Sequence, residues 1–139
     1  MNKLQKKMLK TLDMVVERII KQGYRSLLGN NDCVYTSYIN GKKCHCAVGL
    51  LLKPEYKKVS WDENKSSYCN RVRAGLQDRY KDLPYRFLYD LQSDIHDSEC
   101  SWTYTDKNNT KIKGLSKIGR IRLNKIESYI KKGTYNLID

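Results

Sequence analysis

The chain has 139 residues, with 27 basic against 15 acidic side chains and a formal net charge of +12 at neutral pH, which is the length of one domain with a strongly basic balance. Its two prolines argue against a disordered chain, and the lack of any apolar run near the ~18 residues of a membrane span excludes a transmembrane helix. The basic amino-terminal stretch lacks the apolar core of a secretory signal, so we expect a cytoplasmic protein that does not act at a membrane.

Residues 4–22 are predicted to form an amphipathic helix. Their apolar side chains recur every three or four residues, which places them on one face, and Lys21 followed by Gly23 is typical of a helix end. A β-hairpin is predicted next, because residues 33–38 and 43–48 are rich in strand-forming side chains. The Asn40-Gly41 pair between them favours a type I′ turn.

The second half of the chain is predicted to be mainly helical. Apolar spacing indicates helices ending near Tyr80 and near Ile95, and residues 56–60 and 101–105 are candidates for a third strand. A final helix is expected from Lys111 or Leu115 to Lys132, and its apolar stripe is Leu115, Ile118, Ile121 or Arg122, Ile126 and Ile130. The prediction is a single α+β domain over 1–139, with a small antiparallel hairpin or sheet packed against about four helices.

The basic charge is concentrated toward the carboxyl end of the chain. Residues 107–132 carry nine basic groups and one acidic group, whereas residues 82–99 have a net charge of −4. We interpret the basic helix 111–132 as a possible elaboration of the fold that binds a polyanion. The alternative is a solvated lysine-rich surface with no ligand, because lysine excess alone is a weak signal.

Eight side chains are the candidates for binding nucleic acid or another anion. Six are cations that contact phosphates and two are aromatic rings that stack on bases; they are Lys113, Lys117, Arg120, Arg122, Lys125, Lys131, Trp102 and Tyr104. Tyr135 is a further stacking candidate. None of the standard nucleic-acid recognition motifs is present in the sequence, so no base specificity is predicted.

The cysteines and histidines allow three interpretations. A zinc ion takes four nitrogen or sulfur ligands, and the candidate ligands are Cys33, Cys44, Cys46, His96 and Cys100. No C-x-x-C pair is present, so we favour buried, reduced thiols without a cofactor. Cys46 with His96 and Asp97 is a weak candidate for a nucleophilic catalytic site, since a reactive thiol needs a neighbouring base.

The hairpin region resembles a group of small uncharacterised phage and prophage proteins. The residues that carry the resemblance are Cys33, Tyr35, Gly41, Cys44, Cys46, Ala47, Val48, Gly49 and Pro54, with the later pairs Leu91-Gln92 and His96-Asp97. It covers roughly residues 4–100 in organisation. The resemblance implies a phage origin and a common fold, and it implies no activity. Cys44 and His45 add potential metal ligands within the second strand of the pattern, and the basic tail after Lys107 departs from it as an elaboration.

Three functions follow as hypotheses. The first is a phage-encoded basic accessory protein that binds and regulates or inhibits a host protein with an acidic surface, steered by charge. The second is a protein that binds RNA or DNA through its basic carboxyl-terminal helix, with affinity that falls steeply as salt rises. The third is a small enzyme that depends on Cys46 and His96.

Overall fold

The computed structural model describes residues 1–28, 32–33, 36–56 and 70–137, and it confirms the predicted α+β class. The α-helices are α1 (Lys3–Gln22), α2 (Asn70–Gly75), α3 (Tyr85–Asp90) and α4 (Lys117–Lys131). Six strands form antiparallel pairs, which are β1 (Leu27–Leu28) with β2 (Asp32–Cys33), β3 (Thr36–Ile39) with β4 (Lys42–His45), and β5 (Trp102–Tyr104) with β6 (Ile112–Leu115). Short helical segments are η1 (Pro54–Tyr56), η2 (Asp78–Tyr80), η3 (Leu91–His96), η4 (Glu99–Ser101) and η5 (Thr134–Leu137).

Helix α1 has the predicted apolar face and the predicted end at Gly23, and it also has an amino-terminal cap that was not predicted. Asn2 and Gln5 form a capping box, in which the Asn2 side chain accepts the Gln5 N–H at 2.8 Å and the Gln5 side chain accepts the Asn2 N–H at 2.7 Å. Gly23 ends the helix at φ 82°, a left-handed conformation that favours glycine. The buried face then fixes how the helix lies in the fold.

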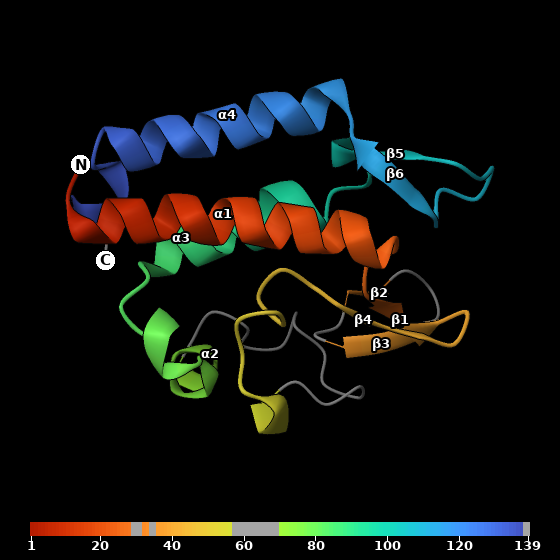
Figure 1. Cartoon of the computed structure of the whole chain (residues 1–139), viewed down its shortest axis with the longest axis horizontal. Helices are drawn as coiled ribbons and strands as arrows, with labels where there is room; N and C mark the ends of the chain where they lie inside the picture. The colour runs from red at the N-terminus through yellow and green to blue at the C-terminus, as the bar shows by residue number, and fades with distance from the viewer. Residues whose placement is uncertain (29–31, 34–35, 57–69, 138–139) are drawn as a thin grey trace.

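Helices α1, α3 and α4 enclose the apolar core. Helix α4 runs antiparallel beside α1, and α3 with η3 lies against the same helix (Figure 1). The Gln5 amide nitrogen donates to the Ile130 carbonyl at 2.9 Å and ties the start of α1 to the end of α4. The core residues from these helices are Met8, Leu12, Val15, Ile19, Phe87, Leu88, Leu91, Ile95, Leu123, Ile126 and Ile130.

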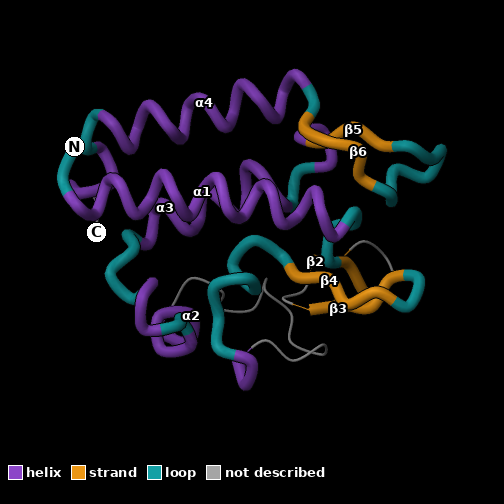
Figure 2. The backbone as a smooth tube through the Cα atoms, in the orientation of Figure 1, coloured by secondary structure: helices purple, strands orange, loops and turns teal. Residues whose placement is uncertain are grey.

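The hairpin β3–β4 confirms the turn prediction. Asn40 and Gly41 have φ values of 50° and 75°, and positive φ at both central residues is the requirement of a type I′ turn. The hairpin lies against the end of α1 (Figure 2). The Gln22 side chain joins the two, because it accepts the His45 N–H at 3.0 Å and donates to the His45 carbonyl at 2.7 Å. The return strand ends at His45, so Cys46 lies in the following turn and the prediction of a strand through 48 is wrong there.

The segment before α4 is a strand, and the prediction that the final helix begins at Lys111 or Leu115 is wrong. Residues 112–115 form β6, which pairs with β5. Strand β5 lies in residues 101–105, one of the two segments predicted as a third strand. Of the other segment, 56–60, residues 57–60 lie outside the described residues. Ser116 is the N-cap of α4 and accepts the Gly119 N–H at 2.9 Å, so the helix begins at Lys117.

The buried face of α4 also differs from the predicted stripe. Ile118 and Ile121 are 47% and 59% exposed, while Gly119 and Leu123 are buried. The reason is a close backbone approach, because a Cβ atom on Gly119 would lie 2.0 Å from the Ser101 carbonyl oxygen. This contact with η4 sets the rotation of α4 and turns both isoleucines outward.

Within the described part of the chain, none of the helices combines the length and apolarity that crossing a membrane requires.

Candidate binding surfaces and the buried polar cluster

The predicted histidine and aspartate pair belongs to a buried network. His96 is 0% exposed, its Nε2 accepts the Ser26 backbone N–H at 3.2 Å, and its Nδ1 lies 2.8 Å from Asp97 Oδ1. Both ring nitrogens are therefore engaged, which assigns the Nδ1 proton to the bond with Asp97. Asp97 and Ser26 thus take the Nδ1 proton and the Nε2 lone pair of His96, while the Gln92 amide nitrogen lies 3.1 Å from Nδ1.

Gln92 connects this network to the turn that follows β4. Its Oε1 accepts the Val48 N–H at 2.9 Å, and its Nε2 donates to Asp97 Oδ1 at 2.6 Å. Gln92 and His96 both lie on η3, a π-helical segment. The Gln92 and His96 side chains thus satisfy backbone N–H groups of two other segments, and Asp97 Oδ1 accepts from both side chains, which is a structural role.

Of the three thiols that the structure describes, two are buried and one is exposed. Cys44 and Cys46 are buried, and Cys46 Sγ accepts the Gly49 N–H at 3.1 Å, whereas Cys100 is exposed on η4. Burial raises the pKa of the Cys44 thiol, which disfavours the reactive thiolate. The side chain of Cys33 lies outside the described residues. Among side chains the structure describes, no three histidines, cysteines or carboxylates are close enough together to hold a metal ion.

The predicted cations of the carboxyl-terminal region are divided between the surface and the interior. Lys113 on β6 and Lys117, Arg120, Lys125 and Lys131 on α4 are exposed. Arg122 turns inward, where its Nη1 donates to the Asp94 carbonyl at 3.3 Å, to Ser101 Oγ at 3.0 Å and to Ser98 Oγ. Arg122 therefore joins α4 to the segment after α3 and has a structural role.

The outward face of α4 combines charge with apolar surface. Lys117, Ile121 and Lys125 follow one another at intervals of four residues, so they are neighbours on one side of the helix. Ile118 lies beside them and is half exposed. We call the set of Lys117, Ile118, Ile121 and Lys125 the α4 face.

The aromatic side chains proposed to stack on bases are occupied within the fold. Trp102 is buried and its Nε1 donates to the His96 carbonyl at 3.4 Å. Tyr135 is buried, and Tyr104 is partly buried with its hydroxyl donating to the Glu99 carbonyl at 2.9 Å. Trp102 and Tyr135 are therefore unavailable as stacking platforms, whereas Tyr104 stays partly exposed.

A second basic feature, which the sequence interpretation missed, lies at the start of α1. Four lysines of α1 and one arginine of η2 surround a groove of about 510 Å³ whose floor includes Met14 and Tyr80. The cations are Lys3, Lys6, Lys7, Lys10 and Arg79. The available signal was the clustering of lysines in the first turns of a helix with no acidic residue in its first turn.

Comparison of the chain with models of protein families, with curated proteins and with solved structures finds no match. What the protein does is therefore inferred from its own residues.

Proposed function

We propose that the chain is a phage-encoded accessory protein that acts by binding an acidic surface of a host protein. The observation that carries the proposal is the position of Ile121, which is 59% exposed and lies one helical turn from Lys117 and from Lys125. An apolar centre with a charged rim is the arrangement of a protein interface. The phage origin rests on the resemblance of the hairpin region.

The isoleucines favour a protein partner over a nucleic acid. Burying apolar side chain against apolar side chain contributes about 25 cal/mol per Å², and a sugar–phosphate backbone offers little such surface to Ile118 and Ile121. The lysines of the α4 face supply steering toward an acidic partner and fix its orientation. The burial of Trp102 and Tyr135 supports the same choice, because base stacking is a main source of affinity for single strands.

A capture experiment with matched variants tests the proposal. Protein immobilised through a terminal tag is exposed to nuclease-treated bacterial extract as wild type, as Lys117→Glu/Ile121→Ser and as Tyr38→Ser/Lys43→Glu. We call Lys117→Glu/Ile121→Ser the α4 variant and Tyr38→Ser/Lys43→Glu the hairpin variant. The hairpin variant makes the same change in charge as the α4 variant and removes an equally exposed apolar side chain from the paired strands β3 and β4. Its binding should match that of the wild type.

We expect a stoichiometric protein partner with the wild type and the hairpin variant, and its loss with the α4 variant. Capture from a parallel untreated extract that is absent from the nuclease-treated extract would assign the surface to nucleic acid. Equal capture by both variants would place the partner elsewhere on the molecule.

A further inference from the structure

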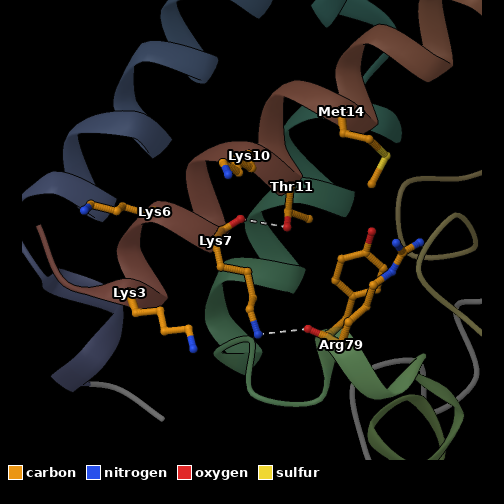
Figure 3. Close-up of a pocket in the computed structure, with 8 residues that line it drawn as sticks. Lys3, Lys6, Lys7, Lys10, Thr11, Met14 and Arg79 are labelled. Carbon is orange, nitrogen blue, oxygen red and sulfur yellow. Dashed lines mark hydrogen bonds between the residues drawn. The ribbon is translucent and has the colours of Figure 1, made fainter.

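The groove between α1 and η2 is held in shape by an ion pair and contains several cations that have no carboxylate partner among the described residues. Lys7 Nζ lies 2.8 Å from Asp82 Oδ1 and donates to the Arg79 carbonyl at 3.0 Å, which pins α1 to η2. Figure 3 shows Lys7 and Met14 extending from α1 toward Arg79. The described residues place no carboxylate within ion-pair distance of Lys3, Lys6, Lys10 or Arg79.

The lysines of α1 destabilise the protein when no ligand is bound. Lys3, Lys6, Lys7 and Lys10 are neighbours at intervals of three and four residues, and like charges at this spacing repel. They also lie near the positive end of the helix dipole, where cations are unfavourable. A bound anion relieves both effects. Asn2 and Gln5 already cap the helix end, so the anion has to lie along the flank of α1 rather than on its terminal amides.

The floor of the groove distinguishes between kinds of anion. The Arg79 guanidinium covers the ring of Tyr80 at 4.8 Å from its centroid, and Tyr80 is buried, so that ring offers no face to a nucleobase. Met14 is partly exposed and gives a flexible apolar contact of the kind that accepts peptide side chains. Lys3, Lys6 and Lys10 are exposed, flexible point charges at the open side of the groove, which does not fit the enclosed, directional pocket of a small ligand.

We infer that this groove binds an acidic amphipathic helix of a partner protein. Carboxylates at three-to-four spacing on such a helix repeat at the interval of Lys3, Lys6 and Lys10 along α1, and its apolar side chains reach Met14. The mode is a helix lying in a groove. The site goes beyond the proposed function, because it requires neither Ile121 nor any other residue of α4.

A synthetic peptide tests the inference on the full chain. The probe is a capped 16-residue helix-forming peptide with glutamates at three-to-four spacing on one flank and leucines on the adjoining face. Controls are the same peptide with glutamine at those positions and a 16-nucleotide DNA strand. Affinity is measured by titration calorimetry, and the methionine methyl groups are followed by ¹³C NMR.

We expect the acidic peptide to bind and to shift the methyl signal of Met14 but not that of the fully buried Met8. Lys3→Glu/Lys6→Glu/Lys10→Glu should weaken binding roughly tenfold or more, because three attractive charge pairs with the peptide become repulsive. The charge-matched control Lys43→Glu/Lys107→Glu/Lys113→Glu changes exposed lysines of β4, of the turn between β5 and β6, and of β6, and it should retain affinity within about threefold, because distant exposed charges are screened.

Equal weakening by both triple variants would show that only net charge acts, and it would overturn the inference. So would a DNA strand that shifts Met14 where the peptide does not. If the peptide binds the groove but the Lys117→Glu/Ile121→Ser variant still captures the partner, this site is retained and the proposed function is refuted. The two failures are therefore distinguishable.

Discussion

The contact between Tyr135 and Asp90 gives the sharpest stability prediction. Tyr135 on η5 donates its hydroxyl to Asp90 Oδ2 at 2.7 Å, and Arg86 Nε lies 3.2 Å from Asp90 Oδ1. Both Tyr135 and Asp90 are buried. Tyr135→Phe keeps the ring packing against Phe87 and Tyr129 while it removes the donor from a buried carboxylate.

We expect Tyr135→Phe to lower the free energy of unfolding by about 1.5–3 kcal/mol, the range for a hydrogen bond to a charged group. A urea titration followed by circular dichroism measures the loss. With a slope of about 2 kcal/mol per molar urea, a loss near 2 kcal/mol moves the midpoint down by about 1 M. Tyr38→Phe is the control, because the Tyr38 side chain is 60% exposed, and its midpoint should not change measurably.

The pH dependence provides a second check on the same residue. Burial and the Asp90 carboxylate raise the pKa of Tyr135 far above its ordinary value. The unfolded chain therefore loses this proton first, so the contribution of Tyr135 is fully present below pH of about 10 and declines at higher pH. The stability difference between wild type and Tyr135→Phe should be constant from neutral pH to mildly alkaline pH and should narrow above that point. A midpoint unchanged by Tyr135→Phe, or a difference that widens at high pH, would refute the reasoning.

Three further predictions concern single residues. Gly119→Ala should destabilise the fold by about 1–3 kcal/mol through overpacking against η4, opposite to the gain of about 1 kcal/mol that alanine brings in an open helix; a higher melting temperature would contradict the close approach. Iodoacetamide with peptide mapping should label Cys100 in the native protein much faster than the buried, less acidic Cys44, and equal rates would disagree with the described burial. The Thr110 hydroxyl and amide lower the pKa of Asp106, so Thr110→Val should raise that pKa toward its ordinary value in a carboxyl ¹³C titration, and an unchanged pKa would exclude this cause.

The features that depend on neighbouring residues in the chain were predictable. The α1 helix follows from apolar spacing and a glycine end, and the β3–β4 turn follows from Asn40-Gly41. The core role of residues 50–52 also follows, because a run of three leucines is seldom left in water. In each case the local preference and the final environment agree.

The features that depend on distant contacts were not predictable from spacing. The rotation of α4 is set by Gly119 against the Ser101 backbone, whereas spacing alone favoured Ile118 and either Ile121 or Arg122 as part of the apolar stripe. The choice between Ile121 and Arg122 depends on Ser98 and Ser101, which accept hydrogen bonds from the Arg122 guanidinium. These contacts join separate elements, so no local pattern contains them.

The candidate site was predicted in part. Exposed cations of α4 were expected from the basic run, while the buried state of Trp102 and Tyr135 was not. The groove between α1 and η2 depends on a hydrogen bond from Lys7 Nζ to the carbonyl of Arg79, which is 72 residues away in the sequence. Such a contact is visible only in the folded chain. Charge counting finds basic segments but does not show which of them face one another.

Site-specific photo-crosslinking tests the binding role of the α4 face most directly. A benzoylphenylalanine side chain is placed at Ile121 in one protein and at the equally exposed Tyr38 in another, and each is irradiated in bacterial extract. We expect one prominent protein adduct from position 121 that high salt diminishes and that position 38 does not form. A nucleic-acid adduct at 121, or the same adducts from both positions, would contradict a protein-binding surface on α4.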